Sequence, residues 1–333
     1  MKKMDRKNLV GVWSAAPTPF LNSGRVDVKS VQRMVEHHCR LGVKGLFLLG
    51  TNGEGPWMTD ARRSDLVRAV VDAGRGRLLI SAQVSDNSAG RILDNMARVK
   101  QDGADLAIIA PPFFLMNATP DHVLALYQEA IHRSPLPVGI YDRGDFSSVK
   151  VPLPVLKAIY SEKKVVLIKD SSCDPARRDM AIGVRARRPG LVLLTGNEFD
   201  CAGYLKAGYD GLLLGGAVFN GYMARLIFEA AVAGDHESAQ WMQNRMNQLM
   251  WKVYGGKKIT CWLAGEKYLL VRMGLFQTRT TLLHYPLTAA CRRAIDGVIK
   301  QDRVLLMPWE SASGKAGFER RGDGRSATAP TAP

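Results

Sequence analysis

A lysine stands where an apolar run ends. Lys169 follows Val165-Val166-Leu167-Ile168 and precedes Asp170 and two serines. Burying an ammonium group at the tip of an apolar strand is costly, and loss of solvent lowers the pKa of a lysine. A neutral lysine amine is a nucleophile that attacks carbonyl carbons. Lys169 is therefore the first candidate catalytic residue, and the chemistry that it predicts is formation of a Schiff base.

Tyr141 ends the apolar run that comes before that of Lys169. If the two runs are neighbouring parallel strands, both side chains reach the same pocket. A phenol beside the amine can relay protons while the adduct loses water and becomes an imine. The protonated imine then accepts electrons and stabilises a carbanion on the adjacent carbon. Because the imine supplies this electron sink, we expect no metal or other cofactor.

A glycine-rich turn, Gly50-Thr51-Asn52-Gly53-Glu54-Gly55, follows an earlier apolar run. Glycine allows tight turns and close approach of the backbone to a ligand. Consecutive N–H groups can hold a carboxylate, and Thr51 and Asn52 add polar side chains. We therefore predict that Thr51, Asn52 and Gly53 bind the substrate, although an ordinary turn would have the same composition.

Four more candidate substrate-binding residues follow apolar runs. Phe114 lies in the apolar segment after the run Leu106–Ala110, where it would form a wall. Gly196 and Glu198 come after the seventh run, and Gly215 comes after the eighth. Glu198 is the candidate for contacting substrate hydroxyl groups.

Eight apolar runs recur along the chain at fairly even spacing, with helical periodicity between them. Most runs are continuous rather than alternating, as expected for parallel strands that are buried on both faces. Eight strand–helix units predict an α/β fold of the (β/α)8 TIM-barrel type over residues 1–233. A doubly wound sheet is the main competitor, and it is disfavoured because no GxGxxG turn follows the first run. The runs are Val12–Ala16, Gly45–Leu49, Leu78–Val84, Leu106–Ala110, Pro137–Tyr141, Val165–Lys169, Leu191–Thr195 and Gly211–Leu214.

The remainder of the chain divides into helices and a tail. Residues 234–302 predict a C-terminal helical extension with helices over His236–Tyr254, Thr260–Met273 and Leu287–Lys300. Residues 309–333 are rich in Ser, Gly, Ala, Pro and Arg. Such a segment buries too little apolar surface to fold, so we expect a disordered tail.

The composition is that of a globular protein, with 333 residues of which 46% are hydrophobic and 23% charged. The formal net charge is +15, but the basic residues are scattered and no nucleic-acid motif accompanies them. We therefore expect a solvated basic surface and no nucleic-acid partner. No apolar stretch reaches the roughly 18 to 20 residues that span a bilayer, so no membrane partner is expected.

The cysteines and histidines indicate neither disulfides nor a metal. Five cysteines are far apart and lack the spacing of a zinc site. The basic N-terminus has no apolar segment behind it, so a signal peptide is disfavoured and a cytoplasmic location is expected. His37 and His38 are adjacent without a carboxylate to complete a site, and we expect them on the surface.

Taken together, the motifs resemble the dihydrodipicolinate synthase/N-acetylneuraminate lyase family of class I pyruvate-type aldolases over residues 9–302. The resemblance implies a lyase in which Lys169 forms a Schiff base with pyruvate, Tyr141 relays protons and the turn holds a carboxylate. It also implies a homo-oligomer, namely a homotetramer. The segments that carry it are Ala16-Pro17-Thr18-Pro19-Phe20, Gly24-Arg25-Val26-Asp27, Gly50-Thr51-Asn52-Gly53-Glu54, Tyr141, Ile168-Lys169-Asp170-Ser171-Ser172 and Gly196-Asn197-Glu198.

Three positions depart from the dihydrodipicolinate synthases of that family. Those enzymes carry a hydroxyl residue in place of Asn52 and a tyrosine in place of Phe114, and these groups form a proton relay. They also hold a substrate carboxylate with an arginine where this chain has Phe146. N-acetylneuraminate lyases carry Ser-Thr in the turn, whereas an asparagine there resembles the 4-hydroxy-2-oxoglutarate and 2-keto-3-deoxy-acid aldolases. A typical dihydrodipicolinate synthase is therefore disfavoured.

We accordingly expect a lyase that cleaves or forms a C–C bond next to pyruvate in a 4-hydroxy-2-oxo acid or a 2-keto-3-deoxy acid. Phe113, Phe114 and Trp57 suggest a partly apolar acceptor pocket. One alternative keeps the lysine imine but eliminates water or ammonia, as the dehydratases and deaminases of the family do. Another is a non-catalytic barrel that binds a small acid.

Overall fold

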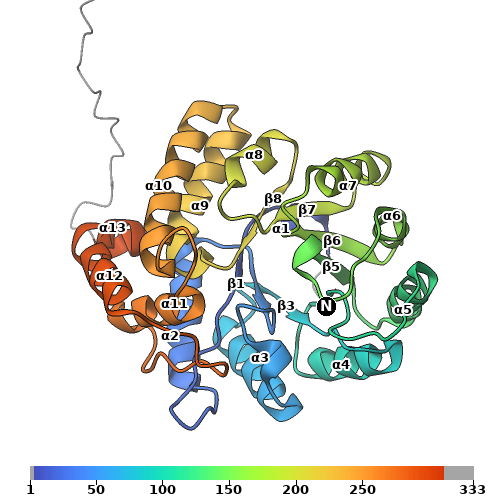
Figure 1. Ribbon diagram of the computed structural model, residues 1–333, viewed down its shortest axis with the longest axis horizontal. Helices are drawn as coiled ribbons and strands as arrows, with labels where there is room; N and C mark the ends of the chain where they lie inside the picture. The colour runs from blue at the N-terminus through green and yellow to red at the C-terminus, as the bar shows by residue number, and fades with distance from the viewer. Residues whose placement is uncertain (1–3, 311–333) are drawn as a thin grey trace, which may run out of the picture.

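A computed structural model describes residues 4–310 of the chain, and its centre is a closed barrel of eight parallel strands (Figure 1). Each strand pairs with its sequence neighbours, and β1 pairs with β8 to close the barrel. The (β/α)8 prediction is thus confirmed, and the doubly wound alternative is excluded. The strands are β1 Gly11–Ala15, β2 Gly45–Leu48, β3 Leu79–Gln83, β4 Leu106–Ile109, β5 Val138–Asp142, β6 Val165–Asp170, β7 Val192–Thr195 and β8 Gly211–Leu214.

Helices surround the barrel as an outer layer (Figure 1). Their starts follow from local sequence: Thr59 accepts a hydrogen bond from the Arg62 N–H, and Thr119 caps a helix that has Pro120 in its first turn. These helices are α2 Val28–Leu41, α3 Asp60–Gly74, α4 Ala89–Gln101, α5 Pro120–Arg133, α6 Leu153–Ser161, α7 Pro175–Arg187, α8 Cys201–Lys206 and α9 Ala217–Val232. Two short 3-10 helices, η1 Gly55–Trp57 and η2 Gly144–Phe146, follow β2 and β5.

The C-terminal helices pack against one side of the barrel, beside α2 and α9 (Figure 1). The first three of them match the helices predicted after the barrel, with ends that differ by up to two residues, and the two short elements that follow were not predicted. Trp309 and Glu310 belong to the last element, and the rest of the predicted tail lies outside the described residues. These elements are α10 His236–Tyr254, α11 Trp262–Arg272, α12 Ala289–Gln301, α13 Arg303–Leu306 and η3 Pro308–Glu310.

The strands are buried on both faces because alternate side chains enter two separate cores. In β6, Leu167 points into the barrel and Ile168 packs against the helices. Lys169 shares the parity of Leu167, so its side chain also points inward. The short helix α1 Arg6–Leu9 places the buried Leu9 in the barrel core, at the end opposite the strand C-termini. The open end of the barrel is therefore the end at which β5 and β6 finish.

The prediction that His37 and His38 lie on the surface was wrong. Their exposed fractions are 2% and 0% because α2 packs against β1 and α9 with this face. His37 Nε2 lies 2.7 Å from the Val218 carbonyl oxygen, and His38 Nε2 lies 2.9 Å from Ser14 Oγ. Burial lowers the pKa of His37 to about 4 and that of His38 to about 3, so both rings serve as neutral core residues.

None of the helices in residues 4–310 combines the length and apolar character that crossing a membrane requires.

Candidate active site

Lys169 and Tyr141 are register partners at the ends of β6 and β5. Lys169 Nζ lies 4.2 Å from the centroid of the Tyr141 ring and 4.9 Å from that of the Phe47 ring. The two rings meet edge to face at a centroid distance of 5.8 Å. Only 5% of Lys169 and 7% of Tyr141 is exposed. The strand ends therefore hold one amine between two aromatic rings, within reach of a phenol.

The surroundings of Lys169 favour a neutral amine. Burial lowers the pKa of Lys169, and this effect outweighs the opposing influence of Tyr141 and Glu198. The nearby cation Arg143 lowers this pKa further. A lysine with a lowered pKa has more of the neutral form that attacks a carbonyl carbon.

The surroundings of Tyr141 favour loss of its proton. Burial alone would raise the pKa of the phenol, but the charges of Lys169 and Arg143 and the hydroxyl groups of Thr51 and Ser171 lower it by more. The pKa of the phenol is thus moved toward neutral pH, where a proton relay is most effective. Tyr141 and Lys169 together can exchange protons with a bound carbonyl compound.

The turn after β2 has a strained backbone. Leu49 and Glu54 adopt left-handed conformations, with φ angles of 62° and 58°. A Cβ atom on Gly55 would lie 2.0 Å from the Leu49 carbonyl oxygen, so only glycine fits there. Strain of this kind is retained where surrounding contacts enforce it. Here the Glu54 carboxylate is fully buried, and it accepts hydrogen bonds from Lys267 and from the Leu282 N–H.

The predicted ligand-binding residues Thr51, Asn52 and Gly53 occupy this turn. In residues 4–310, their backbone N–H groups donate no hydrogen bond. Three free donors in succession suit an anion. The side-chain amide of Asn52, by contrast, already donates to the carbonyl oxygens of Ala15 at 2.9 Å and Gly215 at 3.3 Å. The backbone and Thr51, rather than the Asn52 side chain, are therefore the groups available to a carboxylate.

The ends of β7 and β8 bring Gly196, Glu198 and Gly215 to the same region. A Cβ atom on Gly196 would lie 2.0 Å from Ser171 Oγ and 3.0 Å from Lys169 Cε, so this glycine leaves room for both side chains. A Cβ atom on Gly215 would lie 3.6 Å from Asn52 Cγ and 3.7 Å from Glu198 Oε1. Gly215 therefore separates the turn after β2 from the carboxyl group of Glu198.

Glu198 is held by two donors. Its Oε2 accepts from the Gly216 N–H at 2.7 Å, and its Oε1 accepts from the Tyr254 hydroxyl at 3.0 Å. Burial raises the pKa of Glu198, and these two bonds and the charge of Lys169 oppose that effect. The carboxyl group thus lies close enough to Lys169 for their charges to interact.

Phe114 lies on the rim rather than against the lysine. Its side chain is 63% exposed, and its N–H donates to Asn87 Oδ1 at 2.9 Å. Phe113, Met116 and Phe146 are also exposed, at 41%, 73% and 64%. These four exposed apolar side chains lie on the segments that follow β4 and β5. Contact between Phe114 and substrate stays a prediction.

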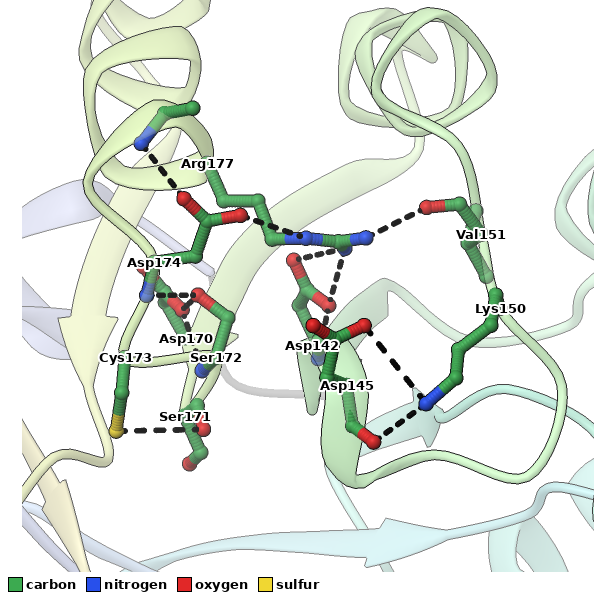
Figure 2. A network of polar contacts seen from close by, with 12 residues as sticks. Asp142, Asp145, Lys150, Val151, Asp170, Ser171, Ser172, Cys173, Asp174 and Arg177 are labelled. Atoms are coloured by element: carbon green, nitrogen blue, oxygen red, sulfur yellow. Dashed lines mark hydrogen bonds and ion pairs between the residues drawn. The ribbon is translucent and has the colours of Figure 1, made fainter.

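Two carboxylates anchor the strand ends from outside. Asp142 and Asp170 directly follow the two candidate catalytic residues, so their side chains point toward the helices. Figure 2 shows the Arg177 guanidinium group between Asp142 and the Val151 carbonyl oxygen. Arg177 Nη1 lies 2.9 and 3.0 Å from the two Asp142 oxygens. This buried ion pair fixes the end of β5, where Tyr141 lies.

Asp170 fixes the end of β6 in a similar way. It accepts hydrogen bonds from the Ser172 N–H at 2.9 Å, the Ser172 hydroxyl at 2.6 Å and the Tyr209 hydroxyl at 2.6 Å (Figure 2 draws Asp170 and Ser172). Burial raises the pKa of Asp170, and these bonds oppose the rise. The carboxyl group thereby sets the direction of the chain directly after Lys169.

Sequence reasoning missed several residues that surround the site. Ser171 was part of a noted segment, and its hydroxyl group acts on Tyr141. Phe47 lies in an apolar run that gave no sign of contact with the lysine. Glu266 and Lys267 reach the turn from a helix more than 200 residues away in sequence. The signal for the last two was a pair of charged residues within an apolar helix pattern.

Comparisons with known proteins give the family. A model of the dihydrodipicolinate synthetase family matches residues 8–301. The N-acetylneuraminate lyase of Enterobacter sp. (strain 638) is 27% identical to this chain over 284 residues, which is 84% of this chain and 87% of that protein.

Solved structures share the fold. The dihydrodipicolinate synthase of Thermotoga maritima matches with a TM-score of 0.81 at 23% identity, covering 89% of this chain and 99% of that one. The enzyme from Bacteroides thetaiotaomicron matches with a TM-score of 0.80 at 24% identity, covering 88% and 98%. Because the family model spans most of the sequence, the chain belongs to the dihydrodipicolinate synthetase family and is a lyase of the pyruvate-dependent class I aldolase type.

Proposed function

We propose that this lyase cleaves a 4-hydroxy-2-oxo acid or 2-keto-3-deoxy acid into pyruvate and an aldehyde through an imine on Lys169. The observation that carries the proposal is the position of the Lys169 amine, buried and 4.2 Å from the ring of Tyr141. Burial lowers the pKa of this amine, which suits it to attack a ketone.

The proposed reaction starts at the 2-oxo carbon. The amine of Lys169 attacks this carbon, and loss of water gives a protonated imine. Tyr141 then accepts the proton of the C4 hydroxyl group, the C3–C4 bond breaks, and its electron pair moves to the iminium nitrogen. An aldehyde leaves, and the enamine takes a proton at C3. Addition of water to the resulting imine releases pyruvate and restores the free lysine.

The turn after β2 is proposed to hold the substrate C1 carboxylate. The unpaired N–H groups of Thr51, Asn52 and Gly53 support this assignment, together with the Thr51 hydroxyl. Glu198 lies on the other side of Gly215, where it would accept hydrogen bonds from substrate hydroxyl groups. The reaction requires no metal or cofactor, because the protonated imine supplies the electron sink.

An elimination is the second candidate. The raised pKa of Glu198 leaves more of its protonated form, which could donate a proton to a leaving hydroxyl group after imine formation. Such a dehydratase would give a product with the carbon count of its substrate. Membership of a family of lyases argues against the third hypothesis, a non-catalytic binding barrel.

A panel of 4-hydroxy-2-oxo acids and 2-keto-3-deoxy acids tests the proposal. Each compound is incubated with enzyme, and pyruvate, aldehyde and unsplit products are measured by mass spectrometry. An aldolase releases pyruvate and aldehyde in equal amounts from at least one compound. A product of unchanged carbon count would support the dehydratase, and turnover without pyruvate would contradict the aldolase.

We also propose that the protein works in the cytoplasm as a homo-oligomer, of which a homotetramer is the expected form. Five free thiols suit a reducing compartment. A second copy would cover the exposed apolar side chains of Phe113, Phe114, Met116 and Phe146. Light scattering after size-exclusion chromatography measures the mass directly, and a monomer at micromolar concentration would contradict the oligomer.

A further inference from the structure

A second carboxyl group contacts the turn from the C-terminal helices. Glu266 lies on α11 and has no exposed surface. Its Oε1 accepts a hydrogen bond of 3.0 Å from the side-chain amide of Asn52. Its Oε2 has no hydrogen-bond partner within residues 4–310. The neighbouring Lys267 instead binds Glu54 and the Thr280 carbonyl oxygen.

The packing of α10 and α11 places Glu266 at this point. A Cβ atom on Gly265 would lie 1.9 Å from the Val253 carbonyl oxygen, so the two helices approach each other closely at this glycine. The residues that follow, Glu266 on α11 and Tyr254 on α10, both reach the region at the end of β8. Close contact between the two helices therefore places the Glu266 carboxyl group and the Tyr254 phenol beside the end of β8.

Charged and titratable groups face Glu266 from each element around it. The turn after β2 contributes Glu54, the segment after β7 contributes Glu198, α10 contributes Tyr254, and α11 contributes Lys267. Burial raises the pKa of Glu266 well above its ordinary value, the Asn52 hydrogen bond opposes this, and Glu198 and Glu54 add to the rise. A further negative charge would be costly here, since Lys267, the cation that acts on Glu266 within residues 4–310, is already paired with Glu54.

The orientation of the Asn52 amide is fixed by its neighbours. The carbonyl oxygens of Ala15 and Gly215 can only accept, so the amide nitrogen must face them. Glu266 Oε1 is the third acceptor for the same nitrogen. A neutral carboxylic acid retains a carbonyl oxygen that can fill this role.

We propose that Glu266 is a positioning residue, which acts as a neutral carboxylic acid to hold Asn52 and thereby the turn that binds the substrate carboxylate. The inference rests on the proposed function, since that function assigns the carboxylate to this turn. Two adjacent α11 side chains then secure the turn, Glu266 through Asn52 and Lys267 through Glu54. Loosening the first contact should weaken pyruvate binding more than it slows chemistry at Lys169.

Borohydride trapping of pyruvate tests this role, with Glu266→Leu and Glu266→Gln compared with the unmodified protein. The fraction of trapped protein at increasing pyruvate gives a half-saturation concentration and a maximal trapping rate. Leucine has similar bulk but no acceptor, whereas glutamine is neutral and retains one. Asn95→Leu is the matched control, because it also replaces a buried polar side chain by leucine. The Asn95 amide donates a hydrogen bond of 3.2 Å to the Val84 carbonyl oxygen.

Glu266→Leu should raise the half-saturation concentration by about tenfold and change the maximal rate much less, since a buried donor loses an acceptor. Glu266→Gln should recover most of that loss at neutral pH. At alkaline pH, the unmodified protein should lose pyruvate affinity more than Glu266→Gln, because only the glutamate can ionise. Circular dichroism confirms that each variant is folded.

Three results separate the possibilities. Equal half-saturation for Glu266→Leu and the unmodified protein would overturn the positioning role. If Glu266→Gln bound pyruvate as weakly as Glu266→Leu, the proposal that Glu266 acts as a neutral acid would be overturned, because an ionised carboxylate would then be required. Failure of the unmodified protein to trap pyruvate at any concentration would instead overturn the proposed function itself.

Discussion

The Nζ atom of Lys169 lies 4.2 Å from the ring centroid of Tyr141, because the two residues are register partners on adjacent parallel strands. Burial lowers the pKa of the lysine, and its charge in turn helps to lower the pKa of the tyrosine. One backbone pairing thus brings together the proposed nucleophile and the proposed proton relay. The chemistry at this pair can be tested by changing one group at a time.

Tyr141→Phe should retain the fold and lower kcat for retro-aldol cleavage by about 10²- to 10⁴-fold, because a positioned proton donor and acceptor is lost. Trapping of pyruvate on Lys169 should persist but become slower. Single-turnover kinetics separates the two steps. If kcat were unchanged, another group would have to move the proton.

The pH dependence follows from the lowered pKa of Lys169. Only the neutral amine attacks a carbonyl group, so imine formation should accelerate as pH rises through this lowered pKa and level off below pH 10.5, the ordinary lysine value. Stopped-flow measurement of imine formation gives the profile. A rate that still increases at pH 10.5 would show that burial does not lower the pKa of the Lys169 amine.

The lowered pKa of Lys169 also makes the stability of the fold depend on pH. Between the lowered pKa and 10.5, the unfolded chain binds more protons at Lys169 than the folded protein does, so the free energy of unfolding should rise with pH in this window. Lys169→Met should remove this rise. Urea unfolding of both proteins at neutral and alkaline pH measures the difference, and parallel curves would contradict it.

Gly196→Ala should reduce activity by about 10- to 100-fold, because the new methyl group displaces reacting groups from their geometry. The Cβ atom would lie 2.0 Å from Ser171 Oγ and 3.0 Å from Lys169 Cε. Gly190→Ala is the control, since nothing lies within 4 Å of a Cβ atom there. The measurement is kcat/KM for both variants, and equal values would contradict the predicted clash of the new methyl group with Ser171 and Lys169.

Arg177→Met should destabilise the fold by about 3 kcal/mol, because it leaves the buried carboxylate of Asp142 without its cationic partner. The exposed pair of Arg133 and Glu129 provides the comparison, since Arg133→Met should cost about 0.5 kcal/mol. Thermal and urea unfolding give both values. Similar losses in the two variants would show that the Asp142 pair does not anchor β5.

The sequence was sufficient to predict the barrel and the proximity of Lys169 and Tyr141, because both depend on short-range patterns. Continuous apolar runs mark strands that are buried on both faces, and the ends of such strands meet at one end of a barrel. Lys169 and Tyr141 each end such a run, so their proximity follows from the topology alone.

The supporting contacts could not be predicted in this way. Glu266 reaches Asn52 only because Gly265 lets α10 and α11 approach closely, and no local pattern encodes that packing. The prediction for His37 and His38 was wrong for a related reason. Histidine occurs on solvent-exposed and on buried helix faces, and packing against α9 and β1 decides that this face of α2 is buried.

The most direct test of imine chemistry is borohydride reduction in the presence of pyruvate, followed by peptide mapping. Lys169 and Lys267 are both buried, so the second lysine serves as an internal comparison within one digest. The predicted result is a stable pyruvate adduct on Lys169, none on Lys267, and none anywhere in Lys169→Met. Absence of an adduct, or an adduct on a different lysine, would contradict the proposed function.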